Sequence, residues 1–150
     1  MKDSLMMLII VSNSTTCRLY RYHHNEHPPL VRLQEINHPE NKLKISELVS
    51  DKSGHYDASP NNQGSYSPPH DPKEVAIDNF TQEIAHILHQ AHTHNGYKKC
   101  VLIAPPRIAG LLAQHFNKPD QAFVTQTIKK DIVHLPDHEL LDFIEAHLKN

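Results

Sequence analysis

The sequence predicts an α/β domain built on a five-stranded mixed sheet in the strand order 3-2-1-4-5, with helices on both faces. Leu5–Val11 and Cys100–Ala104 are nearly continuous apolar runs, a pattern typical of strands that are buried on both sides. A long amphipathic helix pattern stands between them, and a right-handed connection through a helix makes two neighbouring strands parallel. We therefore expect these two strands side by side at the centre of the sheet.

The first 37 residues predict a three-stranded antiparallel meander. Ser12-Asn13-Ser14 is a turn signal after the first apolar run, because asparagine tolerates the backbone of tight turns. In Cys17–Tyr22 successive residues alternate between two faces, with Cys17 and Leu19 on one and Arg18 and Tyr20 on the other. This pattern predicts a strand with one face toward the core and the other half exposed to solvent. Leu30–Ile36 is more polar, as expected of an edge strand.

The middle of the chain contains a long polar segment. Lys52–Pro72 holds four prolines, two glycines, four serines and two asparagines, and such a composition buries too little apolar surface to offset the entropy of ordering it. We predict one domain, residues 1–150, that carries this segment as a long polar loop at 52–72. Leu43, Leu48 and Val49 precede it and fit either a short helix or an irregular segment packed on the sheet.

Two helices frame the second apolar strand. The first has Asp71 as N-cap and Pro72 at its first position, and Asn95-Gly96 ends it near His94. Pro105 and Pro106 stop the strand, and a second amphipathic helix follows. Its apolar face repeats at Ile108, Leu111 and Leu112, and that of the first helix at Ile77, Phe80, Ile84, Ile87, Leu88 and Ala91.

The last third adds a strand and a helix. We interpret Asn117–Asp120 as a loop and Ala122–Ile128 as the fifth strand, and Pro136 opens the last helix. The buried stripe of that helix is Leu140, Leu141, Ile144 and Leu148. This arrangement is ribonuclease-H-like. However, no carboxylate follows the first strand where nuclease chemistry would need a metal ligand, and no P-loop, GxSxG or GxGxxG motif occurs.

Composition narrows the classes of function. The net charge is -2 with histidines neutral, which argues against a dedicated DNA or RNA binder because such proteins carry a basic excess. Cys17 and Cys100 lack metal-site spacing and predict free, buried thiols in a reducing compartment. Leu5–Val11 is only seven residues long, whereas a membrane span needs about 20, and no cleavage signal follows it. We therefore expect a cytoplasmic protein without a cofactor.

Candidate binding residues stand where the parallel strands are predicted to end. Arg107 lies in the first turn of a helix, where unpaired backbone amides attract anions and arginine can clamp an anionic group. The structural alternative is that Arg107 pairs with a carboxylate such as Asp131. Lys130 and Asp131 follow the fifth strand; Lys130 could contact phosphate, or Asp131 could cap a turn beside solvated lysines.

Histidines are the other candidates, since the chain has 14 of them. His86 and His89 lie one turn apart on the long helix and could share a metal ion. His92 continues the series but diverges from His86 around the helix axis. The alternative is a solvated polar face.

Several motifs occur together in order along the chain. They are Val11-Ser12-Asn13-Ser14 followed by Cys17-Arg18-Leu19-Tyr20, then Leu48-Val49-Ser50-Asp51-Lys52-Ser53-Gly54, then Ala104-Pro105-Pro106-Arg107 with Gly110, and finally Lys130-Asp131. This ordered set resembles the bacterial host-attachment protein family over nearly the whole chain. The sequence departs from the family pattern at Asn13, where the family usually has Asp, and at His55, where Arg usually follows the glycine.

The resemblance implies a requirement for attachment to host cells but no mechanism. We expect a non-enzymatic protein that binds a partner, either a protein or the ribosome or tRNA, through the Pro105–Gly110 turn and the Lys52–Pro72 loop. The family is also similar in fold to the middle domain of archaeal and eukaryotic peptide-release factors, which implies a second hypothesis: a ribosome- or peptidyl-tRNA-associated factor. In those factors a Gly-Gly-Gln loop assists peptidyl-tRNA hydrolysis, and here Gln63 in Asn61-Asn62-Gln63-Gly64 is the candidate catalytic residue. The third hypothesis is a histidine-based metal-binding protein.

Overall fold

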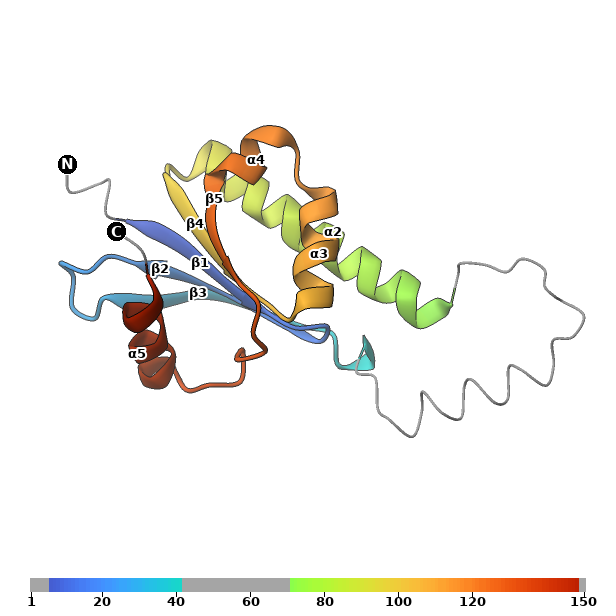
Figure 1. Cartoon of the computed structure of the whole chain (residues 1–150), viewed down its shortest axis with the longest axis horizontal. Helices are drawn as coiled ribbons and strands as arrows, with labels where there is room; N and C mark the ends of the chain where they lie inside the picture. The colour runs from blue at the N-terminus through green and yellow to red at the C-terminus, as the bar shows by residue number, and fades with distance from the viewer. Residues whose placement is uncertain (1–5, 42–70, 149–150) are drawn as a thin grey trace, which may run out of the picture.

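A computed structural model describes residues 6–41 and 71–148. It confirms a five-stranded mixed sheet in the order β3-β2-β1-β4-β5 (Figure 1). Along the chain the elements are β1 (Met7–Ser12), β2 (Thr16–Tyr22), β3 (Leu30–Asn37), the 3-10 turn η2 (Pro39–Asn41), α2 (Pro72–His94), β4 (Lys99–Ile103), α3 (Pro106–His115), α4 (Lys118–Phe123), β5 (Val124–Ile128) and α5 (Asp137–His147). Leu43, Leu48, Val49, His55, Gln63 and most of the polar loop lie outside the described residues.

The two apolar strands pair as predicted. β1 and β4 run parallel in the register Leu8↔Cys100 and Ile10↔Leu102. β5 adds a third parallel strand beside β4, and β2 and β3 complete the antiparallel meander on the other side of β1. Because β1 and β4 have neighbours on both sides and helices over both faces, nearly every residue in them is buried.

β3 is an edge strand with a bulge. Its pairing with β2 shifts between Leu19↔Gln34 and Tyr20↔Arg32, so Leu33 is an extra residue without a partner in the register. The bulge puts Arg32 and Glu35 on the same face of the sheet, where Arg32 Nη1 donates to Glu35 Oε1 at 2.9 Å. Leu33 itself is exposed.

The ends of α2 follow from its terminal residues. The Asp71 carboxylate accepts from the Lys73 amide at 2.9 Å and Pro72 takes the first helical position, as predicted. At the other end Asn95 N–H donates to the Ala91 carbonyl, and Gly96 adopts φ 80°, a left-handed conformation that favours glycine. The predicted apolar face of α2 is buried except for Ile87, which is partly buried.

The interpretation of Asn117–Asp120 as a loop is wrong. Residues Lys118–Phe123 form α4, and the fifth strand starts at Val124 rather than at Ala122. The Asn117 side chain caps this short helix by accepting from the Asp120 amide at 2.9 Å. Only Asp120 and Phe123 of α4 are buried, so no periodic apolar stripe marked the helix in the sequence.

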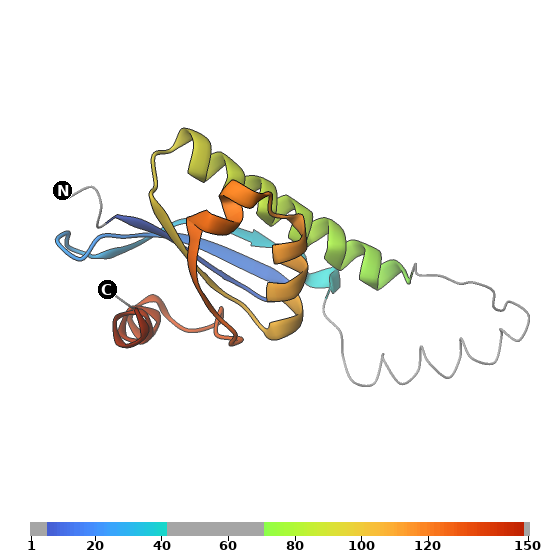
Figure 2. The same cartoon turned by 45° about the horizontal axis from the view of Figure 1, so that its top comes forward.

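The helices cover the two faces of the sheet unequally (Figures 1 and 2). The first face carries α2, α3 and α4, which pack on Leu8, Ile10 and Leu102. The second face carries α5, which packs on Ile9, Val101 and the tyrosines of β2. The expectation that one face of β2 is half exposed is therefore wrong: Tyr20 and Tyr22 are buried on the second face. Cys17 and Cys100 are free and buried, as predicted.

Candidate functional site

The carboxyl ends of three parallel strands meet at one edge of the sheet. Beyond β4, the Ala104 amide donates to the Ile128 carbonyl at 3.0 Å, and the Lys130 amide donates to the same oxygen at 3.1 Å. The segment after β5 is thereby fixed against the end of β4, where α3 begins. In open α/β sheets ligands bind at this kind of edge. We call Pro105–Gly110 together with Lys130 and Asp131 the carboxyl-edge surface.

The turn after β1 is held rigidly and is linked to this surface. Asn13 Oδ1 accepts from the amides of Thr15 at 2.9 Å and of Thr16 at 3.0 Å. Its Nδ2 donates to Asp131 Oδ1 at 3.2 Å. Asn13 therefore ties the β1–β2 turn to the segment after β5, across the end of β4.

Arg107 does not form the ion pair that we considered for it. Asp131 accepts its side-chain hydrogen bond from Asn13 instead. Within residues 6–41 and 71–148, the side chains of Arg107 and Lys130 make no hydrogen bond or ion pair, and both residues are exposed. The three predicted binding residues thus lie at one edge of the sheet, with two cations directed to solvent. Their role in binding stays a prediction.

A second polar cluster lies between α2 and α4. Asp120 has a side chain that is only 4% exposed, and each of its two carboxylate oxygens contacts a different imidazole. His89 Nδ1 lies 2.8 Å from Oδ2, and His92 Nδ1 lies 2.8 Å from Oδ1. His92 also stacks on Phe123, with ring centroids 4.2 Å apart and planes 4° apart. A buried carboxylate needs such partners because desolvating an unpaired charge is costly.

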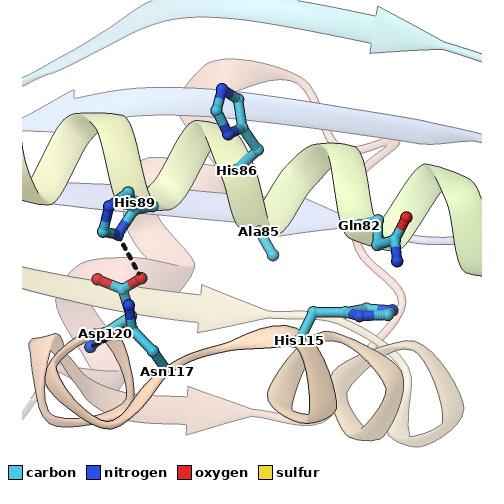
Figure 3. Close-up of a pocket in the computed structure, with 7 residues that line it drawn as sticks. All are labelled: Gln82, Ala85, His86, His89, His115, Asn117 and Asp120. Carbon is cyan, nitrogen blue, oxygen red and sulfur yellow. Dashed lines mark hydrogen bonds and ion pairs between the residues drawn. The ribbon is translucent and has the colours of Figure 1, made fainter.

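His89 and Asp120 border a shallow pocket of about 300 Å³ between α2 and the α3–α4 segment (Figure 3). The Asp120 carboxylate is in hydrogen-bond contact with His89, whereas His86 leaves α2 on the side away from the α3–α4 segment. On the far wall, His115 Nε2 lies 3.0 Å from Asp78 Oδ1. The lining residues are Gln82, Ala85, His86, His89, His115, Asn117 and Asp120.

The proposed metal ligands are not brought together. His89 turns toward Asp120 and not toward His86. In the part of the chain that the structure describes, no group of three or more histidine, cysteine or acidic side chains is placed to hold a metal ion. A metal shared by His86 and His89 alone stays a prediction. Gln63 lies outside the described residues.

The sequence interpretation missed Asp120, and it named His92 only as a histidine that diverges from His86. The spacing of His89 and His92 places both on adjacent positions of one helix side, but their common partner lies in a segment that had been interpreted as a loop. Recognising Asn117 as an N-cap with Pro119 in the first turn would have revealed α4 and directed attention to Asp120.

The comparison with protein families assigns the chain. A family model described as "Protein required for attachment to host cells" matches residues 8–144. The chain belongs to this host-attachment family. The match includes the β1–β2 turn, both walls of the pocket and all of the carboxyl-edge surface. No curated protein sequence matches the chain.

Two solved structures align with most of the chain. An "Archaeal protein" aligns with a TM-score of 0.51 at 8% identity, over 97% of this chain and 34% of that one. The archaeal translation termination factor aRF1 aligns with a TM-score of 0.49 at 9% identity, over 88% of this chain and 32% of that one. The chain thus spans about a third of each solved structure, and at these identities the likeness concerns the fold alone. None of the described helices has the length and hydropathy that a membrane span requires.

Proposed function

We propose that this host-attachment family member acts in the cytoplasm, without catalysis, by binding an acidic protein partner through the carboxyl-edge surface. The observation that carries the proposal is the pair of exposed cations, Arg107 and Lys130, which have no partner among the described residues. On most protein surfaces an exposed lysine or arginine contributes little, because water and salt screen its charge. Here the two stand at the edge where α/β sheets present ligand sites.

The backbone at the start of α3 also attracts negatively charged groups. Pro105 caps α3 without a side-chain hydrogen bond, and the first intrahelical bond runs from the Ala109 amide to the Pro105 carbonyl. The amides of Arg107 and Ile108 therefore lack intrahelical acceptors, and they point toward the partially positive end of the helix. A carboxylate-bearing partner complements both these amides and the two side chains.

The two cysteines are unsuited to thiol chemistry. Burial raises the pKa of Cys17 to about 12, despite a hydrogen bond with Ser12 that lowers it. Burial likewise raises the pKa of Cys100. Both thiols stay protonated at neutral pH and are poor nucleophiles. Free, buried thiols also fit a reducing compartment such as the cytoplasm.

The test uses charge reversal at the proposed surface. A strain that lacks the gene is complemented with the wild type or with the double variant Arg107→Glu/Lys130→Glu, and attachment to host cells is counted. We expect the double variant to lose attachment. The matched control is Lys98→Glu/Lys99→Glu, which makes the same change in net charge with two exposed lysines at the opposite end of β4.

Circular dichroism and the thermal midpoint of each purified variant establish that it is folded. Normal attachment by a folded Arg107→Glu/Lys130→Glu protein would overturn the proposal. An equal loss in both double variants would also overturn it, because net charge rather than this surface would then be responsible.

A further inference from the structure

The pocket between α2 and the α3–α4 segment is separate from the carboxyl-edge surface, since α4 stands at the opposite end of β5. Its polar lining is held in place by contacts behind it. His89 is fixed by Asp120, and Asp120 in turn by His92, which is stacked on Phe123. His115 is fixed by Asp78. Such support from behind keeps binding groups in one orientation before a ligand arrives.

Each supported side chain keeps hydrogen-bonding capacity for a ligand. His89 and His115 each have one ring nitrogen engaged by a carboxylate, which leaves the other available. Asn117 uses its Oδ1 to cap α4, which leaves its amide nitrogen. Among the described residues, Gln82 and His86 make no side-chain hydrogen bond. The Ala85 methyl group adds a small apolar area.

The charges of the lining exclude strongly ionic ligands. In the part of the chain that the structure describes, no lysine or arginine borders the pocket, so a phosphate group would lack the cations that usually hold it. Both oxygens of the single carboxylate, Asp120, are already engaged, so an organic cation would lack an available anion. The lining instead offers donors and acceptors side by side, which suits hydroxyl groups because a hydroxyl does both.

We propose that this pocket binds an uncharged, polyhydroxylated ligand of about one sugar ring. A pocket of about 300 Å³ is at the lower end of the range for small-molecule sites. The amides of Gln82 and Asn117, the imidazoles of His89 and His115 and the methyl group of Ala85 match a ring that carries several hydroxyls and one apolar face. The site makes no use of Arg107 or Lys130.

The experiment is an amide NMR titration of the full chain with glucose, galactose, mannose and N-acetylglucosamine, each raised through the millimolar range. We expect saturable shifts that centre on Gln82, His89 and Asn117 for at least one sugar. Gln82→Ala removes one pocket amide. Asn117→Asp keeps the capping oxygen but removes the amide donor. Each should weaken binding about fivefold or more, which is the size of one lost hydrogen bond.

Asn79→Ala is the matched control, because it removes an exposed amide of α2 that does not line the pocket. Arg107→Glu/Lys130→Glu should bind the sugar normally, so the two proposals fail separately. Saturation by none of the four sugars would overturn the proposal. Tighter binding of glucose 6-phosphate or of zinc chloride than of any neutral sugar would also overturn it, as would equal effects of Gln82→Ala and Asn79→Ala.

Discussion

The two faces of the sheet are built by different means. Of the described helices, α2, α3 and α4 cover the first face and pack on the sheet through an apolar cluster. Among the same residues α5 alone covers the second face, and polar contacts hold its ends as well. Tyr20 Oη donates to Asp137 Oδ1 at 2.9 Å, Tyr22 Oη donates to Glu145 Oε2 at 3.2 Å, and Arg18 Nη1 donates to the Leu135 carbonyl at 3.3 Å.

The difference shows how one helix can cover a face without helical neighbours. Within residues 6–41 and 71–148 no second helix lies beside α5 to fix its position, so apolar packing alone would leave it free to slide. The tyrosines of β2 bury their rings in the core and bind the helix with their hydroxyls. On this face, packing and orientation are therefore supplied by the same side chains.

The largest effect should come from opening a cavity on the first face. Ile84→Ala removes a fully buried side chain of α2. Replacing a buried isoleucine by alanine lowers the free energy of unfolding by about 2–5 kcal/mol, and we expect a loss near the top of this range. Ile144→Ala on α5 should lie near the bottom of that range, because α5 can move toward the sheet and partly fill the space. Urea denaturation measures both, and a larger loss for Ile144→Ala would contradict the comparison.

A smaller effect should follow from removing one polar contact on the second face. Tyr20→Phe keeps the buried ring but removes the hydroxyl that donates to Asp137. We expect a loss of about 0.5–1.5 kcal/mol in the free energy of unfolding, the usual worth of a hydrogen bond. Tyr97→Phe is the control, since the Tyr97 hydroxyl has no hydrogen-bond partner among the described residues. Equal losses for the two variants would show that Tyr20 contributes only its ring.

The smallest effect should be a pH-dependent one at the start of α5. Burial on its own raises the pKa of Asp137, but hydrogen bonds from Arg32 and Tyr20, with the charges of Arg32 and Arg18, outweigh it and leave the pKa below its usual value. A lowered carboxyl pKa in the folded state stabilises the fold above the unfolded pKa of about 3.9, and this contribution is lost as pH falls through the folded value.

Asp137→Asn should therefore reduce stability at pH 6, and the difference from the wild type should shrink as the pH falls below about 4. Urea midpoints at pH 6, 4 and 3 measure it. Asp142→Asn, at an exposed position of the same helix, is the control. A difference that stays constant across this range would mean that the ionised carboxylate is not what matters at position 137.

The sequence was sufficient to predict the fold because the features that decide the strand order are visible in it. These features are the two apolar runs and the residues that start and end the long helix. The apolar runs place β1 and β4 at the centre, and the cap residues Asp71 and Gly96 mark the ends of α2. α4 could not be predicted in this way, because it buries only two residues and depends on the Asn117 cap.

The candidate sites were predicted unequally. Arg107, Lys130 and Asp131 fall at one edge because the carboxyl ends of parallel strands must meet there. The partner of Asp131 could not be inferred, since the Asn13 contact joins residues 118 positions apart and depends on the exact turn after β1. The same limit applies to Asp120, which contacts His89 at a distance of 31 positions in the sequence. Asp120 also lies in α4, a helix that the sequence pattern does not mark.

The bulge in β3 gives the outer strand one residue more than its pairing with β2 uses. Because Leu33 is that additional residue, deleting it would join Arg32 directly to Gln34, whose partners Tyr20 and Leu19 are already neighbours on β2. The ladder would then run without interruption, and Arg32 and Glu35 would stay on the same side of the sheet. A chain that lacks Leu33 should accordingly keep every other residue of β3 in its present place.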